Sequence, residues 1–195
     1  IEEGAKFFVR DLTFEGNKGL SAGTIRGVMA TKERFFIPLL RSGVLKRPDL
    51  DQDVERIKAL YLDRGYLQVK VAEPEIRIDK AANRLDIVIQ IEEGSRFRTG
   101  TVDVKGSTIF TPEELLAGLK LPKEEFFGRD VLRTDLLVLS GKYAELGYVF
   151  VDVVPVTRVR ADETIVDVTF DITEGIKAYV ERIEIRGNTK TRDKV

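Results

Sequence analysis

Few side chains in this sequence could carry out chemistry on a bound molecule. It has no histidine and no cysteine, so it lacks the commonest general base, the thiol nucleophile and the thiolate metal ligand. It also contains no phosphate-binding loop. The paired carboxylates of Glu92 and Glu93 precede Gly94, but this spacing matches no known metal-binding loop. We therefore expect no catalytic residue, no metal site, no cofactor and no enzymatic activity.

The charge balance narrows the classes of partner. The chain has 32 basic and 33 acidic residues and a net charge of −1, which argues against a surface for nucleic acid. No run of apolar residues is long enough to span a bilayer as a helix. The lack of cysteine is compatible with both the cytosol and an oxidising compartment, so it does not indicate where the protein is located.

Three short patterns recur along the chain in the same order, which indicates an internal repeat. One is an acidic residue followed by a glycine, one is an alternating strand that ends in a glycine turn, and one is Tyr-x-x-x-Gly-Tyr. The two series of glycines have the same spacings. The markers are Gly4, Gly94 and Gly175; Gly16, Gly106 and Gly187; and Tyr61–Tyr66 with Tyr143–Tyr148.

The markers divide the chain into units. We expect two whole units, residues 5–94 (unit one) and 95–175 (unit two). Residues 1–4 then resemble the end of a preceding unit, and residues 176–195 the start of a following one. Both ends are therefore expected to be cuts in a longer array.

The hydrophobic patterns predict five elements in each unit, in the order strand, helix, helix, strand, strand. In unit one we expect one helix capped by Ser21 and a second capped by Asp49 or Asp51. In unit two, Thr111 and Glu114 are typical of a capping box. The expected strands are 7–15, 67–78 and 84–92 in unit one, and 97–105, 149–160 and 164–174 in unit two.

Two prolines predict the order of the strands. Pro74 and Pro155 lie in the second strand of each unit, and proline cannot donate to a ladder, so this strand belongs at an edge or carries a bulge. After Val71 the alternating apolar residues move from odd-numbered to even-numbered positions, which indicates a bulge near Pro74. We therefore predict an α+β protein of two tandem βααββ units. Each is a three-stranded mixed sheet, with the last strand in the middle and two helices covering one face.

This combination of features resembles the POTRA (polypeptide-transport-associated) domain. The shared features are the tandem βααββ unit, the glycine turn, the Tyr-x-x-x-Gly-Tyr helix end and the closing Glu-Gly. Residues 179–193 closely resemble the opening of the last such domain before the barrel in the barrel-assembly protein family of Gram-negative outer membranes. The two whole units are then similar to the third and fourth of five. The connection 31–47 between the two helices of unit one is long, and here the sequence departs from the family pattern.

The resemblance implies a function and a location. It implies the periplasmic part of an outer-membrane protein that continues into its own C-terminal membrane β-barrel. Such a part acts as a scaffold and receptor, which binds unfolded outer-membrane β-barrel proteins by strand addition and docks accessory lipoproteins. Related arrays of secretion or import channels, and periplasmic envelope or division proteins, are the alternatives. A KH-like RNA module is disfavoured because neither a Gly-x-x-Gly junction between two helices nor a basic groove is evident.

The second strand of each unit is the candidate site. An exposed edge can be ordinary, or it can accept an extended peptide through main-chain hydrogen bonds, and the resemblance favours the second interpretation. The candidate strand-addition residues are Leu67, Gln68, Val69, Lys70, Val71 and Ala72 in unit one, and Val149, Phe150, Val151, Asp152 and Val153 in unit two.

Three further regions carry expectations. An apolar cluster in the long connection of unit one could cover the core or contact a partner. A hinge with a small, polar contact between the units is expected at Glu93, Gly94, Ser95 and Arg96. The strand-like residues 179–186 are expected to pair with the unit-one edge of a neighbouring molecule. The apolar cluster comprises Phe35, Phe36, Ile37, Leu39 and Leu40.

Overall fold

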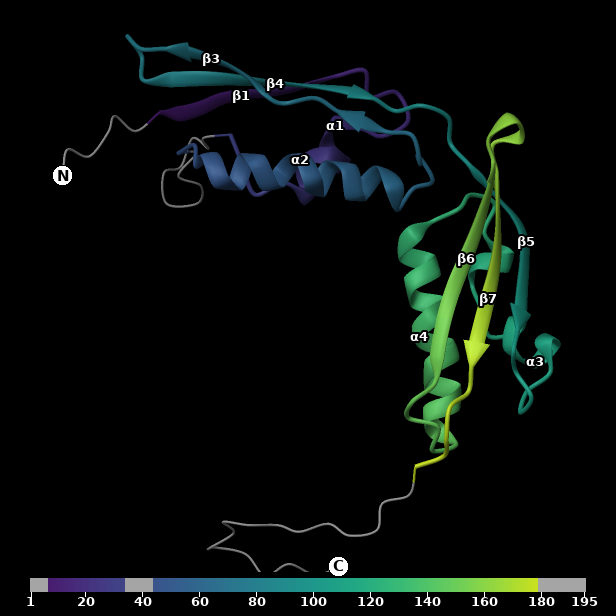
Figure 1. Ribbon diagram of the computed structural model, residues 1–195. Coiled ribbons are helices and arrows are strands. Elements are labelled where there is room, and N and C mark those ends of the chain that lie inside the picture. The colour runs from purple at the N-terminus through teal and green to yellow at the C-terminus, as the bar shows by residue number, and fades with distance from the viewer. Residues whose placement is uncertain (1–6, 34–43, 179–195) are drawn as a thin grey trace, which may run out of the picture.

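The computed structural model describes residues 7–33 and 44–178 and shows two successive units, each a sheet with helices on one face (Figure 1). The expected α+β architecture is confirmed. In unit one the elements are β1 (Phe8–Glu15), α1 (Ala22–Val28), α2 (Arg47–Leu62), β2 (Lys70–Val71), β3 (Glu75–Asp79) and β4 (Arg84–Glu92). In unit two they are β5 (Arg98–Lys105), α3 (Pro112–Leu116), the 3-10 turn η1 (Leu121–Lys123), α4 (Arg129–Glu145), β6 (Asp152–Arg160), the 3-10 turn η2 (Ala161–Glu163) and β7 (Ile165–Thr173).

The last strand of each unit lies in the middle of its sheet, as predicted. In unit one β4 runs parallel to β1 and antiparallel to β2 and β3. In unit two β7 runs parallel to β5 and antiparallel to β6. Pro155 lies within the edge strand β6, and Pro74 lies in the break between β2 and β3. Both prolines thus avoid the central strand, where a missing amide would break a ladder.

The predicted bulge in unit one is present. Val71 lies opposite Ile91, and Ile76 lies opposite Ile87, so the outer strand has one more residue than β4 over this stretch. The extra residue divides the expected single strand into β2 and β3. An extra residue leaves the ladder locally unpaired and bends the edge strand, so the second strand of unit one is interrupted, whereas β6 is continuous.

Each unit has its own hydrophobic core between its sheet and its helices. In unit one Ile57 and Tyr61 of α2 are fully buried against β4. In unit two Leu139 and Tyr143 of α4 occupy the corresponding place against β7. The second tyrosine of each motif packs edge-on against the first, with a ring separation of 5.4 Å for Tyr61–Tyr66 and 6.4 Å for Tyr143–Tyr148.

The helix starts show which sequence signals were decisive. Ser21 Oγ accepts the Thr24 amide at 3.1 Å, and the predicted capping box at Thr111 is present. The prediction of an aspartate cap on α2 is wrong. This helix begins at Arg47, and Lys46 in the capping position makes no side-chain cap. Pro at the second helical position already favours a helix start here, because the first amides have no intrahelical partner to lose.

A buried carboxylate joins the two helices of each unit. The Asp53 side chain is fully buried in α2, and its two oxygens accept the amides of Ala30 (2.6 Å) and Thr31 (2.8 Å), just beyond α1. Its pKa is lowered: burial acts to raise it, but the hydrogen bonds to Thr31 and Ala30 and the contact with Arg56 outweigh burial. Asp135 in α4 is equally buried and makes the corresponding pair of bonds.

The repeated sequence markers meet at one end of each unit. In unit one the Glu93 carboxylate accepts the Gly19 amide and the Tyr61 hydroxyl, both at 2.9 Å. The closing acid, the helix-end tyrosine and the loop after the glycine turn are therefore in direct contact. This contact explains why the three markers recur together along the sequence.

The same contact in unit two has more donors. The Glu174 carboxylate accepts the amides of Thr108 (2.7 Å) and Ile109 (3.0 Å) and the hydroxyl of Tyr143 (3.2 Å). Partial burial acts to raise the pKa of Glu174, but the Thr108 hydroxyl, followed by these donors, favours the ionised form, and together they lower the pKa to about 2.

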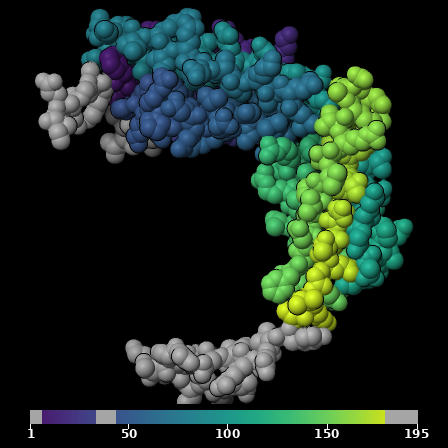
Figure 2. All heavy atoms as spheres, in the orientation of Figure 1, coloured from purple at the N-terminus to yellow at the C-terminus, as the bar shows by residue number. Residues whose placement is uncertain are grey.

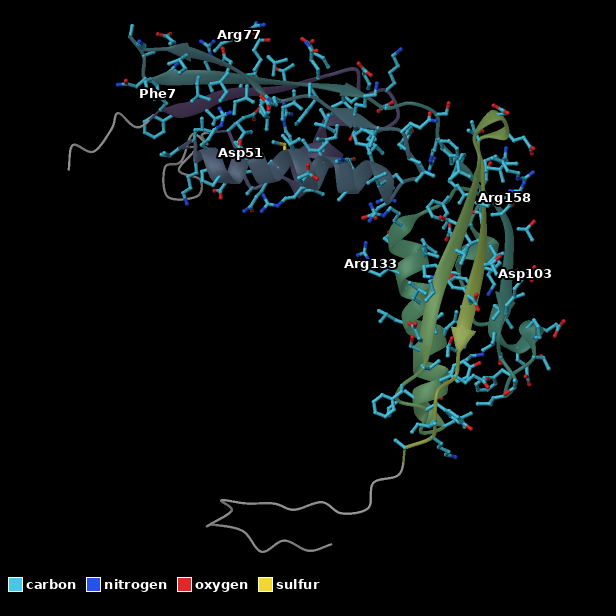
Figure 3. The ribbon with its side chains drawn as sticks, viewed as in Figure 1. Phe7, Asp51, Arg77, Asp103, Arg133 and Arg158 are labelled. Carbon is cyan, nitrogen blue, oxygen red and sulfur yellow. The ribbon has the colours of Figure 1, made fainter. Side chains whose placement is uncertain are left out.

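The two units are joined at a bend, with α2 and α4 on its inner side (Figure 1). The space-filling view shows an open hollow on this side (Figure 2). The outer faces of the sheets carry charged side chains such as Arg77 and Asp103 (Figure 3). In the part of the chain that the structure describes, we find no helix with the length and apolar character needed to cross a membrane.

Replacing the buried Asp135 should test how strongly it holds the helices together. In Asp135→Asn the carboxamide can accept from only one of the amides of Lys120 and Leu121, and its NH2 group faces the other. We expect a loss of about 1–3 kcal/mol in the free energy of unfolding, measured with urea. Asp162→Asn, at an exposed position, is the control and should have almost no effect. Equal stability of the two variants would contradict a structural role for Asp135.

Glu174 should make the stability of the protein depend on pH in the acid range. Its folded pKa of about 2 lies below the ordinary value of 4.5, so its contribution is complete above pH 4.5 and is lost as the pH falls towards 2. Glu174→Gln should weaken this dependence in urea unfolding measured across that range. Glu145→Gln, at an exposed site, should retain it. The same acid dependence in all three proteins would disprove the assignment to Glu174.

Candidate peptide-binding edges

The first strand of each sheet is partly covered along its outer edge. In unit one the Leu45 amide donates to Phe7 O at 3.1 Å. In unit two the Phe127 amide donates to Phe97 O at 3.0 Å, and the Thr99 amide donates to Glu125 O at 3.1 Å. In both units the covering residues come from the connection between the helices. The second strand lies at the opposite edge of each sheet.

The edge at β2 presents outward-facing main-chain groups. The Ala72 amide donates to Gln90 O at 2.9 Å, so the main chain of Ala72 faces β4. Successive residues of a strand direct their amide and carbonyl to opposite sides, so those of Val71 face outward. Beyond the bulge, Glu75 lies opposite Val88, and by the same alternation the groups of Ile76 and Ile78 face outward.

The strand in unit one is shorter than predicted. Leu67 lies before β2 and packs against the core of unit two. Val69 is buried in the core of unit one, and its amide donates to Tyr66 O at 3.3 Å. Gln68 lies beside Gly94. The run 67–72 is therefore not a continuous edge, because tertiary contacts occupy its first half; only Lys70, Val71 and Ala72 are paired with β4.

A groove lies beside this edge. Its volume is about 540 Å³, which is in the range of small binding sites. Small residues border it at Gly16 and Ala72, whereas Lys70 and Glu92 form an exposed ion pair of 3.2 Å on its rim. The groove thus combines an open strand edge with a mixed polar and apolar surface. Its lining residues are Glu15, Gly16, Lys70, Val71, Ala72, Gln90, Ile91 and Glu92.

The edge at β6 is longer and is interrupted only by proline. Residues from Asp152 to Arg160 pair with β7 without a register shift. Because Pro155 has no amide to donate, its nitrogen fits the outward side, and the alternation then places the groups of Val153 and Thr157 outward as well. Val149 and Phe150, which were predicted to lie in the strand, precede it and are 57% and 67% exposed.

Val151 also precedes β6, but its environment differs from that of its exposed neighbours. Its side chain is partly buried and packs against the core of unit two. On β6 itself, Val154 and Val156 are 47% and 53% exposed. Exposed apolar side chains on an open edge strand can contribute contact area to an added strand, alongside the main-chain bonds.

The junction between the units contains specific contacts. Arg96 Nε donates to Arg64 O at 2.8 Å, and the Arg96 guanidinium lies 3.7 Å from the ring centre of Phe126. The Phe97 amide donates to Gly65 O at 2.8 Å. Leu67 of unit one also packs on the core of unit two, so the contact is partly apolar and the expectation of a polar contact is wrong. The hinge itself stays a prediction.

An electrostatic contact also crosses the junction. Asp63 lies 3.8 Å from Arg133 of α4, which points to the inner side of the bend (Figure 3). The pKa of Asp63 is raised, first by burial and then by the nearby charge of Asp130, against the opposing effect of Arg133. The pKa of Asp63 therefore depends on charged residues of unit two.

The acidic residues that could suggest a metal site have other partners. Glu92 pairs with Lys70, and Glu93 accepts the Gly19 amide and the Tyr61 hydroxyl. Within residues 7–33 and 44–178 there is no group of three or more acidic side chains placed to hold a metal ion. The apolar cluster 35–40 and the strand-like segment 179–186 lie outside the described residues.

Sequence reasoning missed several residues that determine these edges. Gly65 has a positive φ of 88°, and a side chain there would approach the carbonyl of Phe127 to 2.7 Å. Its place in the Tyr-x-x-x-Gly-Tyr motif predicted a helix end but not a contact with the next unit. Asp53 and Asp135 recur with the same spacing as Tyr61 and Tyr143, and this was the signal that could have identified them.

Comparisons with known proteins agree with this geometry. Residues 7–94 and 97–175 each match the POTRA family model, which is described as a surface antigen variable number repeat. All of the chain matches "Outer membrane protein assembly factor BamA" from Nitratidesulfovibrio vulgaris at 34% identity and from Neisseria meningitidis serogroup B at 29%. It spans 25% of each of these relatives.

A solved structure has the same fold. The crystal structure of Haemophilus influenzae BamA POTRA3-5 superposes with a TM-score of 0.66 at 20% identity, over 96% of this chain and 73% of that one. The family model covers most of the chain as two consecutive matches, and these coincide with the two units of the structure. The expected resemblance is confirmed, and the chain belongs to the POTRA family.

Proposed function

We propose that the chain is part of the periplasmic receptor region of an outer-membrane protein assembly factor in a Gram-negative bacterium. Its matches to BamA proteins over its whole length support this assignment. In this proposal the two units act as a non-enzymatic scaffold that precedes a membrane β-barrel in the same protein. They bind segments of unfolded outer-membrane β-barrel proteins by strand addition.

The observation that carries the proposal is the outward-facing main chain of Val71 at the edge of β2. The outer side of β2 has no strand beside it in the described structure, whereas its inner side is paired with β4. An extended segment that pairs there would be held through backbone groups, which every sequence has. Binding through the backbone does not depend on side-chain sequence, which suits a receptor for many different barrel strands. These strands share an alternation of apolar and polar residues and have no common sequence motif.

We also propose that the array docks accessory lipoproteins. The apolar cluster in the long connection of unit one is the candidate contact. The support is its sequence, since a run of large apolar side chains in a connection favours a partner surface where it is exposed. The cluster comprises Phe35, Phe36, Ile37, Leu39 and Leu40.

Proline at an outward-facing amide should weaken strand addition and preserve the fold. Val71→Pro removes an amide that faces away from β4, and Val71→Ala removes the side chain but keeps this amide. We expect Val71→Pro to bind a fluorescent peptide from an outer-membrane barrel strand several-fold more weakly than Val71→Ala. Anisotropy titration measures the affinity, and circular dichroism checks the fold. In unit two, Val153→Pro and Val153→Ala form the matching pair.

The proline variants also show which result would contradict the proposal. If both folded proline variants bind the peptide as tightly as their alanine partners, strand addition does not occur at these edges. Val69→Pro is unsuitable for this test, because the Val69 amide already donates to Tyr66 O and its side chain is buried.

The proposed hinge at residues 93–96 should be restrained by Arg96. Arg96→Ala removes the bond to Arg64 O and the contact with Phe126, so the units should sample a wider range of orientations. Spin labels at Glu55→Cys and Ser140→Cys, one on the long helix of each unit, should give a broader distance distribution. Arg84→Ala, at an exposed site at the start of β4 away from the junction, is the comparison. Equal distributions would show that Arg96 does not restrain the junction.

A further inference from the structure

The outer edge of β1 carries a contact that its sheet does not need for its own ladder. The connection between the helices covers the start of this strand, where the Leu45 amide meets Phe7 O. Further along the strand, the side chains of Arg26 and Glu33 lie against the edge at Leu12. An open edge strand can template the addition of another chain, so what covers it is informative about binding.

The two side chains occupy both main-chain groups of one residue. Arg26 Nη2 donates to Leu12 O at 2.6 Å, and the Leu12 amide donates to Glu33 Oε1 at 3.1 Å. The pair is closed by an ion pair of 3.3 Å between the guanidinium and the carboxylate. One donor and one acceptor therefore face Leu12, as they would from a neighbouring strand. The Leu12 amide also reaches Asp11 Oδ1 at 2.9 Å.

Other contacts hold the pair in position. The buried Asp53 carboxylate fixes the Thr31 amide at 2.8 Å, and Lys32 Nζ donates to Arg26 O. These bonds join the end of α1 to the residues that lead to Glu33. The Arg26 guanidinium lies 5.8 Å from the ring centre of Phe14 on β1 and so extends along the same edge.

Unit two has no equivalent pair. The turn glycines Gly16 and Gly106 align the units, and the positions that correspond to Arg26 and Glu33 are then Leu116 and Lys123. The leucine side chain has no polar group, and the lysine side chain can donate hydrogen bonds but cannot accept them. Lys123 Nζ donates instead to Ala117 O at 3.2 Å. The arrangement is thus a property of unit one and does not follow from the shared fold.

We propose that Arg26 and Glu33 guard the outer edge of β1. They occupy the Leu12 amide and carbonyl, exclude extended polypeptide from this edge, and so restrict strand addition in unit one to the opposite edge at β2 and β3. For client segments this inference rests on the proposed function. For a second copy of the chain it does not, because any exposed edge can pair with its own copy.

Self-association provides the test. Arg26→Ala/Glu33→Ala frees the Leu12 carbonyl and leaves the Leu12 amide only its bond to Asp11 Oδ1 of the neighbouring residue. Two such edges can pair around a two-fold axis. We expect the sedimentation coefficient of the variant to rise with concentration over roughly the µM to mM range, where unpaired strand edges associate. The sedimentation coefficient of the unmodified chain should show no such rise. Because the sequence has no cysteine, adding Thr13→Cys to the variant should give a disulfide-linked dimer on a non-reducing gel.

Two controls separate the guard from loss of charge or fold. Glu33→Gln keeps an oxygen that accepts the Leu12 amide, so it should remain monomeric. Glu55→Ala/Lys58→Ala removes one exposed acidic and one exposed basic side chain from the middle of α2, and should also remain monomeric. Thermal unfolding by circular dichroism identifies the folded variants. If the double alanine variant misfolds, Glu33→Leu, which lacks the acceptor, takes its place.

The outcomes distinguish the two proposals. A folded guard variant that stays monomeric and does not cross-link overturns the guard, whatever the peptide experiments show. Dimerisation of this variant supports the guard even if no peptide binds any edge, in which case only the proposed function fails. If both hold, the guard variant that also carries Val71→Pro should regain peptide binding several-fold over Val71→Pro alone.

Discussion

A three-stranded sheet leaves the outer main-chain groups of two strands without a ladder partner, and this constraint governs the whole structure. In a small unit there are too few strands to close the sheet on itself, so each edge must be covered, interrupted or used. The connection between the helices covers the first edge of both units. The second edge is interrupted, by a bulge in unit one and by Pro155 in unit two. The two edges of each unit therefore differ, because only the first is covered by the connection between the helices.

Covering the first edge depends on fixing the long helix of each unit. In unit one α2 is held by Asp53 and by Tyr61, which lie about 12 Å apart along the helix axis. Asp53 bonds to the main chain that follows α1, and the Tyr61 hydroxyl bonds to Glu93 at the end of the central strand. The helix is thereby joined to both the connection and the sheet. Asp135 and Tyr143 repeat the arrangement in unit two, so the same two contacts determine where each connection can run.

The sequence predicted those parts of the fold in which a local signal and a tertiary contact coincide. Tyr61 and Glu93 recur in register because they meet in space, together with the loop that follows Gly16. Pro74 marked a bulge because proline cannot join a ladder. Prediction failed where tertiary packing overrode local preference. Val69 has good strand chemistry but is taken into the core. Asp53 lies among the acidic residues of an amphipathic helix, where a surface position was the natural interpretation. Glu33 reaches Leu12 across 21 residues of sequence, and no local pattern indicates such a bond.

The interruptions also bear on how strongly any segment could be held. On unit one the outward groups of Val71 are separated from those of Ile76 by the bulge, and on unit two Pro155 removes the donor between Val153 and Thr157. Neither edge therefore offers a long, unbroken series of donors. With a net ~0.5–1.5 kcal/mol for each hydrogen bond, two or three bonds give only a few kcal/mol, before the cost of ordering an extended chain. Strand addition here would be weak and quickly reversible on a single unit.

Two units in tandem raise the effective concentration of edges for one chain, so a client could be retained by the array while each contact stays exchangeable. Such exchange is what a receptor needs if it is to pass its client onward.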